Sequence, residues 1–433
     1  MNLKHTFSVL LVGFISISFG QEILQHKQHT LESHGYLRTG LGRSLSGGEM
    51  VEFMAPGAMV KPRFGNEANH YSELQFDYRY QPNDRRDSYE IVYMMATYLA
   101  YGSTDLTKSI KPETSQLYFK WNKFYKEADI WIGRRYYQRE NIDILDWFWI
   151  NSGQGADVGV GLENLTFNSK MNLNVALLRF SDKLQDPAHQ GELFEDYKID
   201  ARLKDISLST NLNLNLIGQI GFRNGIDNSI YDEKTGFTLG AWTNYTQDNF
   251  RNRTTIIYRD GVNMINNPYS GKGLLEVSAT GNQVYDLDKA NDLQILTDIQ
   301  YENNSNGFLG AITYEHKDFG IKTAKGEDKT LDHMNVTGRY SRYLSDRYAL
   351  TFDVGYDYVN HNDGVAGGVF KATFSPEIKW KKGMFSRPSI RPFITYAKWS
   401  EDLKGQVGIV NDNDVYVDKT NGVTAGLQLE VWW

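Results

Sequence analysis

The sequence predicts an all-β protein, a transmembrane antiparallel β-barrel, and three observations lead to this prediction. Polar and apolar residues alternate in segments along the whole chain, as in strands with two unlike faces. The chain begins with an apolar segment of the kind that directs export. No later segment reaches the ~18 consecutive apolar residues that a transmembrane helix requires. A membrane protein without such a helix must be a closed barrel, because only a barrel then pairs every backbone group within lipid.

The first 20 residues have the features of a secretory signal peptide. Lys4 precedes the apolar run of residues 7–15, and the small residues at positions 18 and 20 suit cleavage before Gln21. The run is too short and wrongly flanked for a spanning helix. We therefore expect residues 1–20 to be removed and residues 21–433 to form a single outer-membrane barrel domain.

The strand pattern recurs between residue 34 and the C-terminus. Residues 35–41, 71–78, 172–177 and 352–358 each place a more polar face opposite an apolar one. Connections such as residues 303–307 and 324–329 are rich in Gly, Asn, Asp or charged residues, which suits turns and solvated loops. At about 23 residues for a strand and its share of loop, the mature chain gives about eighteen strands, within the range of known barrels.

The last eight residues, from Gly426 to Trp433, are the most informative segment. Leu427, Leu429, Val431 and Trp433 share one face, while Gln428, Glu430 and Trp432 share the other. In a soluble protein such a terminal edge strand would favour aggregation. In a barrel the apolar face contacts lipid, the polar face contacts a wet lumen, and no edge remains. By the same parity we expect Leu37, Leu74, Leu427 and Val431 to face lipid.

Composition agrees with a barrel and disfavours other classes. Aromatic residues make up 13% of the chain, yet the mean hydropathy is −0.50. Both fit strands that are wet on one face. There is no cysteine, so neither disulfides nor thiolate metal sites can form, and the net charge of −7 is spread without a basic run for nucleic acid. A soluble array of β-sandwiches is the alternative, but no linkers or shifts in composition are visible.

No constellation of residues indicates an enzyme or a metal site. The nine His are scattered, without a His-x-x-x-His pair or a nucleophile motif, so a barrel lipase or protease is disfavoured. The run Asn411–Asp414 is similar to part of a calcium loop but lacks its Gly and final Glu. We interpret it as a solvated extracellular loop and expect no catalytic residue, no cofactor and no metal.

Five motifs, in order along the chain, together resemble the maltoporin family of sugar-specific outer-membrane porins. They are His34–Gly40 with Ser46–Glu49, Arg63–Glu67 with Tyr71–Leu74, Trp131–Arg139 with Asp146 and Ser152–Ala156, Ser386–Arg391 with Thr395–Trp399, and Glu430–Trp433. The resemblance implies a trimer of 18-stranded barrels, each narrowed by an inward-folded constriction loop. It also implies a path of lumen aromatics, flanked by charged residues, along which maltodextrins slide.

The chemistry of such a path can be stated from the sugar itself. A glucose ring has an apolar face of C–H groups, which aromatic rings can stack on, and a rim of hydroxyls, which Arg and carboxylate groups can hydrogen-bond. Permeation requires several weak, similar sites in series, because one deep site would trap the sugar.

The resemblance implies which residues bind the substrate. They are the aromatics Tyr36, Tyr71 and Trp432 and the charged residues Arg38, Arg63, Glu73, Arg139 and Asp146, with Phe148 at the constriction. For these aromatics, the strand alternation also places the side chain on the polar face, toward the lumen. For most other aromatics we favour an interfacial girdle. A lumen Arg could instead form a salt bridge that supports the wall or a folded loop. Of Arg134 and Arg135, only one can face the pore.

The sequence departs from the family pattern at several positions. Thr254 and Met334 align with family aromatics, Phe148 lacks a tyrosine hydroxyl, and Asn141 replaces a carboxylate. The aromatic that the family contributes from a neighbouring subunit has no clear counterpart, although Tyr98 and Tyr101 lie in that region. Either the path is shorter, or aromatics such as Trp242 or Phe393 replace the missing ones. A general diffusion porin for small hydrophilic solutes is the alternative, and scattered lumen aromatics would favour it.

Overall fold

The computed structural model describes residues 21–100, 112–167, 171–184, 191–226, 231–265, 270–278, 281–408 and 415–433. The expected signal peptide at residues 1–20 and the run Asn411–Asp414 lie outside these residues, as does Tyr101.

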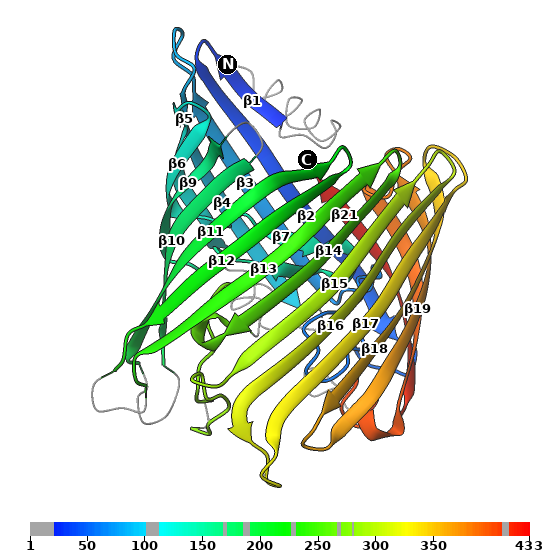
Figure 1. The fold of residues 1–433 in the computed structure, drawn as a ribbon. Coiled ribbons are helices and arrows are strands. Elements are labelled where there is room, and N and C mark those ends of the chain that lie inside the picture. The colour runs from blue at the N-terminus through cyan, green and yellow to red at the C-terminus, as the bar shows by residue number, and fades with distance from the viewer. Residues whose placement is uncertain are drawn as a thin grey trace.

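The fold is a closed antiparallel β-barrel of eighteen strands, which confirms the predicted fold class (Figure 1). Consecutive strands pair around the ring, and the last strand pairs with β2 to close it. The barrel strands are β2 (His29–Ser44), β3 (Asn69–Tyr80), β4 (Ser88–Ala100), β5 (Glu113–Tyr125), β6 (Ala128–Arg134), β9 (Val158–Phe167), β10 (Met171–Lys183), β11 (Leu193–Ser209), β12 (Leu212–Arg223), β13 (Lys234–Gln247), β14 (Phe250–Asp260), β15 (Asn291–Glu302), β16 (Asn306–Lys322), β17 (Asp328–Tyr343), β18 (Tyr348–His361), β19 (Val365–Lys379), β20 (Ser389–Trp399) and β21 (Asn421–Trp432).

The remaining elements are short. Strand β1 (Gln21–His26) pairs with the start of β2, and β7 (Glu140–Ile142) pairs with β8 (Trp147–Ile150). Within the described residues the 3-10 turns are η2 (Asp143–Leu145), η3 (Gly261–Asn263) and η4 (Glu401–Leu403). None of the helices in the described residues is long and apolar enough to cross a membrane.

The two faces of the strands differ as the alternation predicts. In β21 the side chain of Leu427 is 41% exposed on the outer surface, whereas Gln428 and Glu430 are 1% and 0% exposed inside the barrel. Leu37 pairs with Val431 on the outer face, between Tyr36 and Arg38, whose side chains turn inward to line an internal chamber. The lipid face therefore carries the apolar residues.

The two ends of the barrel differ in their connections. At one end the turns are as short as residues 126–127, 210–211 and 248–249, while at the other the connections extend to residues 45–68, 135–157 and 261–290. Strand β1, the first described element, and the C-terminus at Trp433 lie at the short-turn end (Figure 1). Outer-membrane barrels have short periplasmic turns and longer extracellular loops, so the short-turn end, where the chain ends at Trp433, is the periplasmic end.

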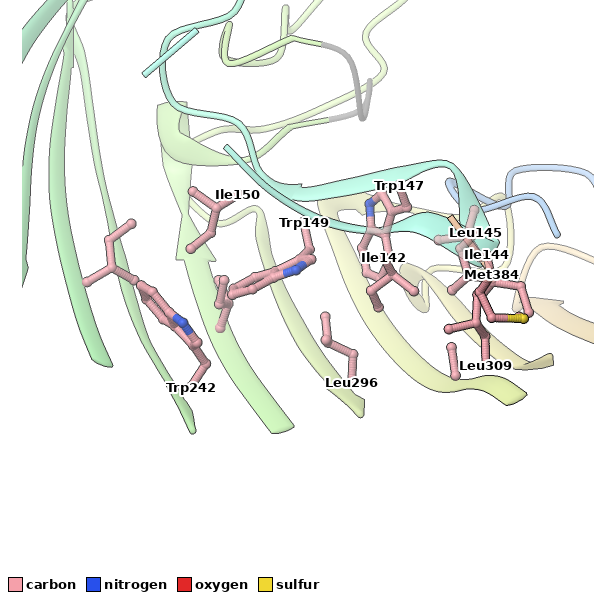
Figure 2. Close-up of a cluster of buried hydrophobic side chains, with 14 residues drawn as sticks. Ile142, Ile144, Leu145, Trp147, Trp149, Ile150, Trp242, Leu296, Leu309 and Met384 are labelled. Atoms are coloured by element: carbon pink, nitrogen blue, oxygen red, sulfur yellow. The ribbon is translucent and has the colours of Figure 1, made fainter. Parts of the chain in front are cut away.

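Several long connections pack on lumen-facing side chains, where a single inward loop was expected. Residues 261–290 do so through the carbonyls of Gly271 and Leu274, which accept from Lys198 and Arg223, and two other connections form cores inside the barrel. Residues 135–157 carry the β7–β8 hairpin, and their apolar side chains pack on residues of the barrel wall. Figure 2 shows Trp149 of this loop near Trp242 of β13; their ring centres are 5.5 Å apart and the rings meet edge to face. Residues 45–68 form a second core, in which Phe53 packs on Trp399 and Tyr416. These loops fill part of the lumen and restrict its open space.

Candidate functional site

The expected site residues come together around one chamber inside the barrel. The chamber has a volume of about 500 Å³ and is lined by wall residues of β2 to β4 and by both inward-folded loops. Of the expected residues, those lining it are Tyr36, Arg38, Arg63, Tyr71, Glu73, Arg139, Asp146 and Phe148. The ninth, Trp432, lies beside it against Tyr36, with ring centres 6.4 Å apart and planes 22° from parallel. The sequence motifs thus converge in space, although they are up to 396 positions apart.

Four aromatic side chains form an oblique row across neighbouring strands. Trp432 on β21 lies opposite Tyr36 on β2, and the rings of Tyr36 and Tyr71 are 5.9 Å apart, centre to centre. Tyr71 on β3 lies opposite Tyr98 on β4, and both line the chamber. Trp432 is near the periplasmic end of its strand and Tyr98 near the loop end of its own, so the row follows the direction of the lumen.

Arg63 and Glu67 of the first inward loop hold that loop to the wall through buried ion pairs. Arg63 contacts Glu67 at 2.9 Å and also pairs with Glu430 of β21. Glu430 is fully buried and is contacted by Arg387 and Arg391 as well. Burial by itself would raise the pKa of the Glu67 carboxyl, but the guanidiniums of Arg38 and Arg63 outweigh it and hold the pKa well below its usual range. Arg63 therefore supports the wall and lines the chamber.

Arg38 joins the two inward loops. Its guanidinium lies 3.8 Å from Glu67 of the first loop and 3.8 Å from Asp146 of the second, and it donates to Asn69 at 2.8 Å. Asp146 follows η2 in a left-handed backbone conformation, which turns the chain and directs this carboxylate toward β2. The two carboxylates flank Arg38 at ion-pair distance from different loops, so its first role is structural.

Glu73 and Arg139 keep more of their hydrogen-bonding capacity for the chamber. Glu73 accepts a hydrogen bond from Tyr71 at 2.5 Å, and Arg139 donates to the side-chain oxygen of Gln154 at 3.1 Å. Among the described residues, neither has a partner of opposite charge within 4.0 Å. The chamber thus offers an acceptor and a donor beside the aromatic row.

The structure corrects the alignment at two positions. Met334 lies on the outer face of β17 and is 46% exposed, between the buried His333 and Asn335. Thr254 is likewise exposed on β14, next to the buried Thr255. An aromatic side chain at either position would face lipid rather than the lumen. The alignment was wrong there because the register of a strand decides the facing, and a slip of one residue reverses it.

Trp242 and Phe393 do not replace the missing aromatics. Both point inward, but Trp242 is 1% exposed, because Trp149 packs on it, and Phe393 is 5% exposed. Tyr98 instead extends the row from within the same chain. Of the two adjacent arginines, Arg135 pairs with Glu163 at 2.5 Å, whereas Arg134 lies opposite the exposed Leu117 on the outer face.

The sequence reasoning missed several side chains near the chamber. Lys61 and Asp143 line it, and Tyr136 packs on Arg139. Lys61 and Asp143 lie in loops, where no strand alternation predicts which way a side chain faces. Tyr136 lies within the Trp131–Arg139 motif, but the motif did not predict a role for it. In the described part of the chain, no group of three or more His, Asp or Glu side chains is placed to hold a metal ion.

Comparison with known proteins gives one family match along almost the whole chain. The model of the LamB porin family matches residues 31–433. Among solved structures, the trimer form of in-vitro folded OmpT, an outer membrane protein of Vibrio cholerae, has a TM-score of 0.41 at 11% identity, covering 94% of this chain and 100% of that chain. OmpF of Salmonella typhi in complex with daunomycin has a TM-score of 0.42 at 11% identity, covering 94% and 99%.

Proposed function

This chain belongs to the LamB porin family of bacterial outer-membrane channels, and we propose that it conducts maltodextrin-type linear oligosaccharides by facilitated diffusion. The observation that carries the proposal is the aromatic row from Trp432 through Tyr36 and Tyr71 to Tyr98. A row of aromatic rings beside hydroxyl-binding groups suits the two sides of a glucose ring.

The proposed path has several comparable contacts instead of one deep pocket. Tyr36, Tyr71 and Tyr98 line the same chamber, so a sugar could pass from ring to ring without leaving an aromatic surface. Glu73 and Arg139 flank the row and provide an acceptor and donors for hydroxyl groups. Several weak sites in series favour conduction over trapping.

A single-channel experiment tests this function. The purified protein is inserted into a planar bilayer and its ion current is recorded while linear α-glucans of increasing length are added. We expect reversible block that strengthens with glucan length, because longer chains contact more rings. Tyr36→Ala and Tyr71→Ala should each weaken it. Unrelated linear glycans of the same length are the control, and equal passage of all solutes without block would support a general diffusion porin instead.

We also propose, from the family alone, that the protein is a homotrimer. Strand alternation carries no information on subunit number. Mass measurement in mild detergent decides the question, since a species of three chains is expected and a monomer contradicts it.

A further inference from the structure

Arg139 is held differently from the other guanidiniums of the chamber. Its Cζ lies 4.0 Å from the ring centre of Tyr136 and 4.3 Å from that of Phe148. Arg38 and Arg63, by contrast, lie against carboxylates. In the part of the chain that the structure describes, no carboxylate lies within 4.0 Å of the Arg139 guanidinium. Two aromatic rings and one hydrogen bond to Gln154, and not a close carboxylate, therefore hold this side chain.

The position of Phe148 follows from the alternation along β8. Its neighbours Trp147 and Trp149 are buried in the core between the inward loop and the barrel wall. Alternate side chains of a strand point to opposite faces, so Phe148 is turned to the chamber, which it lines. Two buried indoles thus hold the backbone that carries the Phe148 ring.

The position of Tyr136 is fixed from the other side of the loop. Its backbone N–H donates to the side-chain oxygen of Gln116 on β5 at 2.9 Å. Gln138 has a φ of 42° and turns the chain between Tyr136 and Arg139. The Gln138 side chain donates to Glu163 of β9 at 2.8 Å, and its carbonyl accepts from Arg202 of β11 at 2.6 Å. Three strands of the wall therefore anchor this turn.

We infer that Tyr136 and Phe148 are positioning residues, an aromatic clamp that presents the edge of the Arg139 guanidinium to sugar hydroxyls. The inference rests on the proposed function. One nitrogen of Arg139 donates to Gln154, which also accepts from Asn151 at 2.8 Å. A guanidinium has five N–H donors, so others remain for the chamber, and bonds from a charged donor are stronger than neutral ones. Phe148 therefore acts on the sugar through Arg139, and the hydroxyl that it lacks is not needed.

A double-mutant cycle tests the clamp by glucan block of single channels. Phe148→Leu and Tyr136→Leu should each raise the dissociation constant for block by about three- to tenfold, because each removes one cation–π contact. Arg139→Lys should weaken block by about tenfold, since an ammonium group lacks the planar fork that stacks and donates in fixed directions. In the Arg139→Lys background the Leu substitutions should add little. Phe148→Tyr and Tyr136→Phe keep the rings and should leave block unchanged.

The outcomes separate the clamp from simpler roles. If Phe148 only narrows the pore, Phe148→Leu raises the ion conductance. Its effect on glucan block is then the same in the unmodified channel and in the Arg139→Lys background, and this additivity overturns the inference. Unchanged block in both Leu variants also overturns it, while block of the unmodified channel still supports the proposed function. The two rings lie on different segments, so either Leu variant alone carries the test if the other does not assemble. No block of the unmodified channel would overturn the proposed function itself.

Discussion

The backbone of Gly35 lies beneath the indole ring of Trp433 at the seam where the barrel closes. The two residues exchange backbone N–H···O hydrogen bonds, both of 3.1 Å. A Cβ atom on Gly35 would lie 2.2 Å from Cζ2 of the indole, a distance that no side chain tolerates. Pairing of β2 with β21 fixes the backbone, so only glycine fits under the terminal tryptophan.

Gly35→Ala should therefore weaken closure of the barrel. Overpacking of this kind costs about 1–3 kcal/mol, because the indole must leave its place. The measurement is the temperature at which the folded band disappears in heat-modifiability gels. Gly218→Ala on β12 is the matched control, since a Cβ there has no neighbour within 4 Å. Equal behaviour of the two variants would contradict the proposed role of the Gly35–Trp433 contact.

Leu429→Arg should destabilise the folded barrel through its lipid-facing side. Leu429 lies opposite Thr39 and Ile390 on the outer face of β21. An Arg near the bilayer midplane of a barrel costs about 2–4 kcal/mol. Unfolding by denaturant in lipid vesicles measures this change. Asp346→Arg in the turn between β17 and β18 should have little effect, because that side chain is exposed to water. A Leu429→Arg variant as stable as the unmodified protein would refute the assigned facing.

Glu430→Gln should release the first inward loop. This carboxylate is fully buried among Arg63, Arg387 and Arg391, and neutralising it leaves three guanidiniums with less compensation. Removing one partner from a buried ion pair costs about 3–5 kcal/mol. Hydrogen exchange of residues 45–68 should become faster. The control is Asp328→Asn, which breaks an exposed ion pair with Lys322 and should leave the exchange rate of residues 45–68 unchanged. If Glu430→Gln also leaves that exchange rate unchanged, Glu430 does not anchor the loop.

Trp432→Ala should weaken glucan block while leaving ion conductance equal or higher. Arg387 packs over one side of the indole, with Cζ 4.2 Å from the ring centre, and Tyr36 lies nearby. Loss of a stacking platform corresponds to about tenfold in affinity. Tyr396→Ala removes an aromatic ring from the outer face and serves as control. If Trp432 only packs at the seam, the variant assembles poorly and whatever folds is blocked as before.

Sequence reasoning succeeded where a strand decides the geometry. Leu427 and Gln428 differ in burial as their alternation requires, and Tyr36, Tyr71 and Glu73 line the chamber because lumen parity is a local property. The segments at 303–307 and 324–329 contain turns as predicted. The reasoning failed at Met334 and Thr254, where alignment across a poorly matched region lost the register. The sequence also did not predict the positions of Tyr136 and Lys61, because both lie in loops, where side chains do not alternate with a period of two residues.

The sequence by itself therefore determined the barrel, its closing strand and the faces of its strands, because a period of two residues is enough to separate lipid from water. Only the tertiary structure decided which lumen groups remain available. Arg63 and Arg38 are engaged by carboxylates from distant segments, Trp242 is covered by Trp149, and Arg139 is packed by two rings. These outcomes depend on how the long loops fold into the lumen, and such packing joins residues that no local pattern relates.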